Sequence, residues 1–169
     1  MYELVLRVFD ICRLRKGPEA MPYSLTVLSQ CLIAYIALSF AVAYITDGLS
    51  SAGLQAGLEI LLLAGFTYAV LMLYRKPLRF RQTFSALLGA DALVSLAAVP
   101  ALASLSIGRA SLPAFILLLM LTFWHWLITS HIFSRALDES FFFGMGIALL
   151  YSLGNYQLLS WLLSELTLV

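Results

Sequence analysis

Charged side chains are scarce in this sequence. Asp, Glu, Lys and Arg make up 11% of its 169 residues, whereas hydrophobic residues make up 62%. Soluble globular domains carry about 25% charged and about 45–50% apolar residues. A composition so poor in charge excludes the ordinary soluble class. It predicts an integral membrane protein.

Cysteine and histidine are also rare, with two of each. Cys12 and Cys31 lie near the side of the membrane that we expect to be cytoplasmic, where disulfides do not persist, so we expect two small buried thiols. His125 and His131 are six residues apart on one predicted helix and therefore face different directions. No cysteine or carboxylate cluster accompanies them, so we expect neither a metal site nor a cofactor.

Several sequence motifs of catalysis are missing. The sequence has no phosphate-binding loop, nucleophile elbow, zinc-ligand spacing or pair of catalytic carboxylates. The cations cluster beside apolar runs, and nothing in the sequence points to nucleic acid. We therefore expect a protein that is not an enzyme and whose first partner is the lipid bilayer, with anionic headgroups beside the cations.

Long apolar runs dominate what the sequence does contain. About 20 residues of helix cross the roughly 30 Å of hydrocarbon in a bilayer. Five runs have about this length, at 25–45, 56–73, 84–105, 114–133 and 141–163. We therefore predict an all-α membrane protein with five transmembrane helices, forming a single membrane domain over residues 1–169.

The first 16 residues predict a different kind of helix. Polar residues recur every three or four positions between apolar ones, which is the spacing of an amphipathic helix. The run is too short and too interrupted to cross a bilayer. We predict an interfacial helix on the inner leaflet, with three cations among the headgroups: Arg13, Arg15 and Lys16.

The distribution of Lys and Arg predicts the orientation. With the N-terminus inside, nine of the ten fall on the inner side and only Arg109 on the outer side, as the positive-inside rule requires. An odd number of spans then puts the C-terminus on the other side. The residues expected to contact lipid headgroups or a partner at the inner face are Arg13, Arg15, Lys16, Arg75, Lys76, Arg79, Arg81 and His131.

Asp91 and His125 are the most notable polar residues within the predicted spans. Each lies ten residues from a basic boundary, at Arg81 and Arg135 respectively, so each lies roughly 15 Å deep at 1.5 Å per residue. A short loop joins the two helices that carry them. If these helices are neighbours, as the short loop indicates, the two side chains can form a hydrogen bond or an ion pair, and whether they touch stays open.

Two interpretations of this pair remain open. One is a structural clasp between helices, since interhelical hydrogen bonds of this kind contribute about 0.6 kcal/mol on average. The other is a proton relay, because ionisable groups inside a bilayer are commonly functional. Thr122 and Thr129 share a helical stripe with His125, which predicts a supporting polar seam.

A second polar pair is predicted at the outer face. Glu59 lies near the start of the second span, and Arg109 follows the third. Both positions are close to the outer interface, where a carboxylate stays solvated. We therefore expect Glu59 and Arg109 to form a solvated ion pair there.

The layout of the chain permits a comparison with known families. A short N-terminal segment precedes five predicted spans, and the basic loop passes into Phe80-Arg81-Gln82-Thr83-Phe84-Ser85-Ala86-Leu87. In these features the chain resembles the Yip1-type family of five-span membrane proteins. It also resembles small bacterial inner-membrane proteins at Gly17-Pro18-Glu19, Pro22-Tyr23-Ser24 and His131-Ile132-Phe133.

The resemblance carries expectations about location and role. Eukaryotic Yip1-type proteins are associated with vesicle trafficking and GTPase partners, but this chain lacks their long acidic N-terminal region. The bacterial resemblance implies a component of the inner membrane, with a cytoplasmic N-terminus and a periplasmic C-terminus.

Two functions follow from these observations. The favoured one is a non-enzymatic accessory or scaffold component of an inner-membrane assembly, because small residues on the helices permit close approach of a membrane-protein partner or of a second copy. The alternative is a small proton-linked transporter that uses Asp91 and His125. A hydrated cavity at their level would favour the transporter, and dry packing would favour the scaffold.

Overall fold

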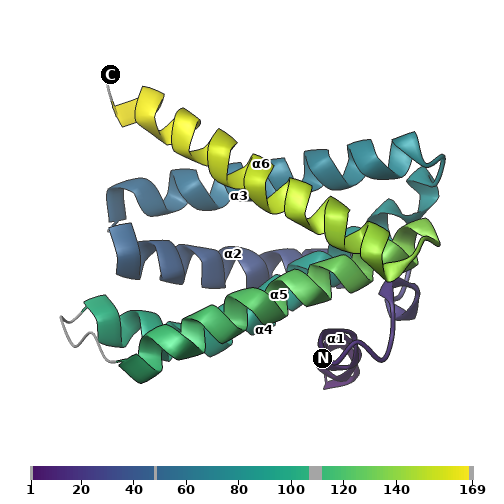
Figure 1. Cartoon of the computed structure of the whole chain (residues 1–169), viewed down its shortest axis with the longest axis horizontal. Coiled ribbons are helices and arrows are strands. Elements are labelled where there is room, and N and C mark those ends of the chain that lie inside the picture. Colours follow the sequence, from purple (N-terminus) through teal and green to yellow (C-terminus); the bar gives the residue numbers. More distant parts are fainter. Residues whose placement is uncertain (1, 48, 107–111, 168–169) are drawn as a thin grey trace.

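The structure is a computed structural model that describes residues 2–47, 49–106 and 112–167. Within these ranges the chain is helical and has no strand (Figure 1). The elements, in order, are α1 (Tyr2–Cys12), η1 (Pro18–Ala20), α2 (Leu25–Asp47), α3 (Leu49–Leu73), η2 (Pro77–Arg79), α4 (Phe80–Ser106), α5 (Leu112–Leu137) and α6 (Phe141–Thr167). The predicted all-α fold class is confirmed.

Four of the described segments are long and apolar enough to cross a membrane: Leu25–Ile45, Gly53–Leu73, Pro77–Ser106 and Leu112–Leu137. Many of their apolar side chains point outward, including Phe115, Leu119 and Phe123 of α5. Such a surface would be costly in water. These helices indicate a multi-pass membrane protein. The fifth predicted run is helical as α6, and its crossing of a membrane stays a prediction.

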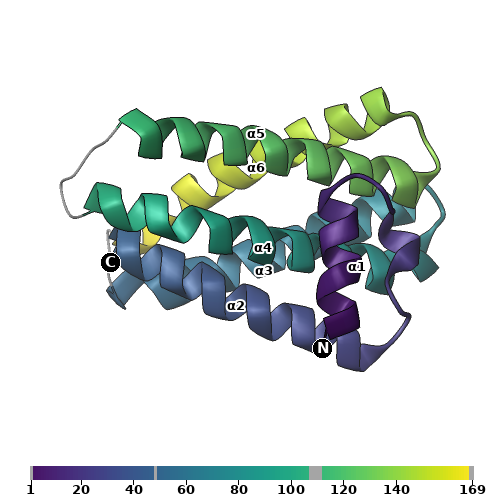
Figure 2. The same ribbon diagram turned by 90° about the horizontal axis from the view of Figure 1, so that it is seen from below.

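The five long helices form a closed ring. Each contacts two neighbours, in the order α4, α2, α3, α6, α5 and back to α4, and α3 also contacts α4. Figures 1 and 2 show these helices running lengthwise, with α1 crossing them near one end. We call this the basic end, because it carries the α3–α4 and α5–α6 connections with Lys76, Arg79 and Arg135.

Helix α4 is the centre of packing at the basic end. Every residue from Thr83 to Ala90 is buried, whereas beyond Ala92 the only other buried residue of α4 is Ala101. An unbroken buried stretch of eight residues means that protein surrounds this part of the helix on all sides. The half of the ring near the basic end is therefore closely packed, and the other half is more open.

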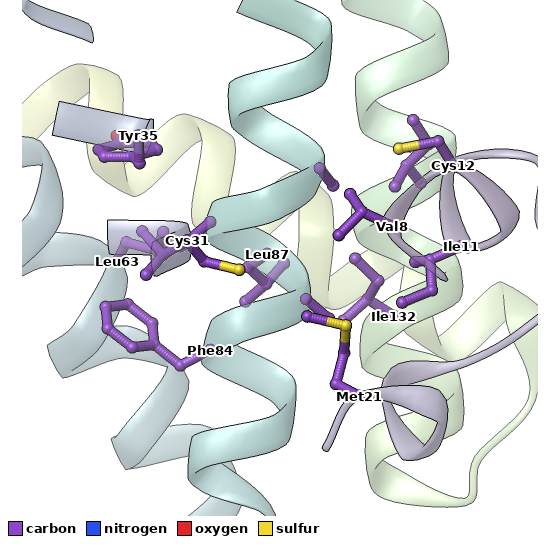
Figure 3. Packing of buried hydrophobic residues seen from close by; sticks show 14 of the residues in the cluster. Val8, Ile11, Cys12, Met21, Cys31, Tyr35, Leu63, Phe84, Leu87 and Ile132 are labelled. Atoms are coloured by element: carbon purple, nitrogen blue, oxygen red, sulfur yellow. The ribbon is translucent and has the colours of Figure 1, made fainter. Parts of the chain in front are cut away.

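Helix α1 completes this packing. Figure 3 shows Val8 and Ile11 of α1 gathered with Leu87 of α4 and Ile132 of α5, and all four belong to the main buried cluster. Gly89 permits this approach, since a Cβ atom there would meet Val8. The predicted N-terminal helix is thus present over residues 2–12, and its place at the membrane surface stays a prediction. Cys12 and Cys31 are buried free thiols, as predicted.

Helix ends near the basic end share one backbone motif. Leu14, Arg75 and Asp138 have φ values of 59°, 58° and 55°, in the left-handed region that closes a helix. After α3, the Lys76 N–H donates to the Leu71 carbonyl at 2.8 Å, which satisfies a carbonyl that the helix leaves free. These turns reverse the chain within a few residues and keep the connections at the basic end short.

Helices α5 and α6 approach closely at Gly144. This glycine is buried, and a Cβ atom there would collide with the Ser130 backbone oxygen and with Ser134. The absence of a side chain is therefore what permits the crossing. From this point α6 diverges along the ring and reaches α3.

Candidate functional site

Asp91 and His125 meet between α4 and α5. His125 Nε2 lies 2.6 Å from Asp91 Oδ1, and their side chains are 35% and 13% exposed. When Asp91 is ionised, the His125 Nε2–H donates this hydrogen bond, because a carboxylate can only accept. The short distance is typical of a charge-assisted hydrogen bond. The structure thus brings together Asp91 and His125, the two residues for which the sequence predicts the same depth in the membrane.

This pair opens onto a cavity of about 400 Å³. All five long helices contribute to its wall, and most of the contributing side chains are polar. None of the described lining residues is Lys or Arg. The lining residues are Tyr35, Ser39, Val42, Ala43, Gln55, Glu59, Asp91, Val94, Ser95, His125, Tyr151, Ser152, Asn155 and Tyr156.

Glu59 is half-buried and lines this cavity. The Tyr35 hydroxyl donates to its Oε2 at 3.4 Å, and Gln55 Nε2 donates to its Oε1 at 3.3 Å. The predicted position near the outer interface stays a prediction. Helix α3 begins at Leu49, whereas the span was predicted to begin near residue 56. Glu59 is therefore ten residues into the helix, about 15 Å along it. Arg109, its predicted partner, lies outside the described residues.

Sequence reasoning missed most of the cavity wall. Its polar members recur at a spacing of four, which places both members of a pair on one face of a helix. Four helices supply such pairs: Tyr35 and Ser39, Gln55 and Glu59, Asp91 and Ser95, and, on α6, both Tyr151 with Asn155 and Ser152 with Tyr156. This repeated spacing of polar residues in otherwise apolar helices is the sequence pattern that could have predicted the cavity wall.

The two predicted supporting threonines lie elsewhere. Thr122 is exposed, and its hydroxyl donates to the Leu118 carbonyl at 2.9 Å. Thr129 is buried. Neither lines the cavity, so the structure does not bring them to the Asp91–His125 pair.

At the basic end, Asp138 joins two connections of the ring. Its Oδ2 lies 2.9 Å from Lys76 Nζ and 2.9 Å from Arg79 Nη1, and Lys76 also donates to the Leu137 carbonyl. Hydrogen bonds from Arg79 and then Lys76 lower the pKa of Asp138 to about 2. These contacts tie the α3–α4 connection to the end of α5.

The other predicted inner-face residues also have partners within the chain. Lys16 pairs with Asp10 at 2.7 Å, and Arg135 pairs with Glu19 at 2.6 Å. His131 Nε2 lies 3.2 Å from the Lys16 carbonyl oxygen. The guanidinium groups of two further residues lie over aromatic rings, Arg13 over Phe9 and Arg81 over Tyr23. Two more are exposed, Arg15 and Arg75.

No family model, characterised protein or solved structure matches this chain. The resemblance to the Yip1-type family therefore stays a prediction. Among the described residues there is no group of three or more His, Cys, Asp or Glu that could hold a metal ion. The chemistry of the cavity has to be argued from its geometry.

Proposed function

We propose that this protein moves a small polar solute across a membrane in a process linked to proton movement, and that Asp91 and His125 take up and release those protons. The observation that carries the proposal is the cavity onto which this pair opens. A structural clasp needs only two side chains in contact. It does not need polar groups from three further helices around a cavity of about 400 Å³, because polar groups at bilayer depth are costly.

The membrane arrangement is part of the proposal. Helix α6 is taken as the fifth span, since its 27 residues extend about 40 Å. Helix α1 lies on the inner leaflet of a bacterial inner membrane, with a cytoplasmic N-terminus and a periplasmic C-terminus. The bias of Lys and Arg supports this orientation, and the exposed Arg15 and Arg75 are available to anionic headgroups.

Gain or loss of a proton by the Asp91–His125 pair changes the net charge of the cavity in which a solute binds. Loss of the proton shared by Asp91 and His125 makes the cavity more negative by one charge. The other titratable groups near Asp91 come from each packed element: Cys12 of α1, Tyr35 of α2, Glu59 of α3 and Tyr151 of α6. A solute whose affinity differs between the two charge states is thereby coupled to protons.

The closely packed basic end provides the barrier in this scheme. Between the pair and the basic end, α4 is buried without interruption from Thr83 to Ala90. A carrier needs a closed side and an open side, which exchange as its helices rock about the binding site. The buried stretch is the closed inner side of this conformation.

Asp91→Asn tests the proposal. The purified chain is reconstituted into vesicles that contain a pH-sensitive dye, and the internal pH is followed while amines, amino acids and sugars are added in turn. We expect at least one solute to drive proton movement through the native chain, and Asp91→Asn to slow it by about 100-fold, as removal of a proton-transfer group does. Glu3→Gln, on the exposed side of α1, is the control. Equal rates for Asp91→Asn and the native chain would overturn the proposal.

A second function, as an accessory or scaffold subunit, is favoured by a different observation. Gly53, Gly57 and Gly65 of α3 each have open space where a Cβ atom would be, so a partner helix or a second copy can approach the backbone there. Purification in mild detergent tests this. Recovery of a defined complex that Gly57→Leu disperses supports it, and a monomer in both cases counts against it.

A further inference from the structure

The charges that line the cavity are unbalanced. With one proton shared between them, Asp91 and His125 form a pair that is neutral overall, whichever of the two carries that proton. Glu59 adds a carboxylate, and none of the described lining residues is Lys or Arg. The cavity therefore carries one negative charge when Glu59 is ionised. A charge in a site away from water requires a counter-charge or a proton.

The contacts of Glu59 leave room for such a counter-charge. Its described donors are all neutral. Tyr35 and Gln55 lie at 3.4 Å and 3.3 Å, which is long for a hydrogen bond to a carboxylate, and the Ser39 hydroxyl is the third. A carboxylate has about four acceptor positions. Glu59 can therefore accept a further, charged donor.

Two other features of the wall suit the same kind of ligand. Asn155 Oδ1 is a buried acceptor that has no hydrogen-bond partner among the described residues, so it can accept an N–H from a ligand. Three tyrosines, Tyr35, Tyr151 and Tyr156, line the cavity, and the faces of aromatic rings attract cations. These features favour a positively charged group that has N–H donors.

We propose that the cavity binds a small organic ammonium ion, with Glu59 as its counter-ion and Asn155 as a second acceptor. The inference rests on the proposed function, in that the solute carried is this cation. A volume of about 400 Å³ is at the small end of the range for ligand sites, which suits a small cation. An organic anion is excluded by repulsion from Glu59.

The cation and the proton compete in this scheme. With the cation bound and Glu59 ionised, the cavity is neutral overall. An added proton on Glu59 removes the counter-ion, and an added proton on the Asp91–His125 pair places a positive charge in the same cavity. Either proton weakens binding of the cation, so the two are exchanged rather than carried together.

Three probes of equal chain length test the charge requirement: butylammonium, butanol and butyrate. Binding to the full chain in lipid nanodiscs is measured by calorimetry at neutral pH. We expect butylammonium to bind at least about tenfold more tightly than butanol, a difference that one desolvated ionic contact supplies, and butyrate not to bind. Equal binding of butylammonium and butanol would overturn the inference.

Glu59→Gln keeps the shape of the side chain and removes its charge. We expect it to weaken butylammonium binding by about tenfold or more, while Glu3→Gln on exposed α1 leaves binding unchanged. If Glu59→Gln does not yield folded protein, the comparison of the three probes on the native chain still decides the matter. Unchanged affinity in folded Glu59→Gln contradicts the assignment of Glu59.

The experiments distinguish failure of the ammonium site from failure of the proton-linked carrier. Proton movement driven by neutral or anionic solutes, without binding of butylammonium, refutes the ammonium ion and leaves a proton-linked carrier in place. Binding of butylammonium that depends on Glu59, without proton movement in vesicles, supports the cation site and refutes the carrier.

Discussion

At the scale of single residues, position along a helix matters more than residue type. Asp91 and Asp138 are both aspartates with cationic or ionisable partners. Asp91 lies between helices on the wall of a cavity, where a charge is costly and a change of proton has consequences for a solute. Asp138 lies in the exposed α5–α6 connection and pairs with Lys76 and Arg79 of the α3–α4 connection. The first is a candidate for function and the second for structure.

The pKa of Asp138 leads to a prediction about stability at low pH. Hydrogen bonds from Arg79 and then Lys76 lower this pKa from its ordinary value of 3.8 to about 2. A group whose pKa is lower in the folded state stabilises that state above its ordinary pKa, and the contribution is lost as pH falls through the folded value. Thermal melting should therefore show a loss of stability between about pH 4 and pH 2.

Asp138→Asn provides the comparison. This variant should start from a lower melting temperature at neutral pH and show a smaller fall over the same acidic interval, because it cannot gain a proton there. Glu3→Gln should follow the native curve. Identical acid profiles for Asp138→Asn and the native chain would show that the two ion pairs contribute no stability.

At the scale of helices, close approach at small residues decides which elements are neighbours. Gly144 and Gly146 are two residues apart on α6. A Cβ atom at Gly144 would collide with the backbone of α5, whereas nothing lies within 4 Å of the corresponding position at Gly146. Two glycines in the same apolar segment therefore have different roles.

Gly144→Ala and Gly146→Ala form a matched pair of variants. We expect Gly144→Ala to destabilise the protein by about 1–3 kcal/mol, because the helices must separate to admit the methyl group. Gly146→Ala should be neutral or slightly stabilising, since alanine favours a helix over glycine. Unfolding in a detergent series measures both, and equal effects would contradict the close crossing of α5 and α6.

The helices themselves were predictable, because each apolar run is long enough to specify one. The start of α3 was not. Residues 46–56 contain Asp47, Gly48, Ser50, Ser51 and Gly53, which indicate a loop by composition, and tertiary context outweighs such weak local preferences. The earlier start of α3 places Glu59 ten residues into the helix, where its side chain lines the cavity.

The contact between Asp91 and His125 was predictable for a geometric reason. Depth follows from counting residues along a straight helix, and a short loop makes two helices neighbours. The rest of the cavity depends on α2, α3 and α6 closing the ring. No local pattern specifies which distant helices meet, so the pairs of polar residues on those helices remained unassigned.

At the scale of the whole molecule, the structure is divided along its length. One half is packed around α4 by α1 and its neighbours, and it carries the ion pairs of the basic end. The other half contains the polar cavity. The orientation in the membrane decides which half of this asymmetric structure faces the cytoplasm. The proposed function therefore depends most on orientation.

Labelling of introduced cysteines in intact bacterial cells measures that orientation. Arg75 at the basic end and Leu112 at the start of α5 are both exposed, and they lie at opposite ends of the ring. With the N-terminus inside, Leu112→Cys should react with a maleimide that cannot cross the membrane. Arg75→Cys should react only after the cells are broken.

The native cysteines do not interfere with this experiment. Cys12 and Cys31 are buried. Burial, together with the nearby charge of Asp91, raises the pKa of Cys12 to about 12, so its thiol stays protonated and unreactive. The unmodified chain is therefore a blank for both variants. Labelling of Arg75→Cys in intact cells would reverse the orientation, and the cavity would then lie in the cytoplasmic half of the membrane.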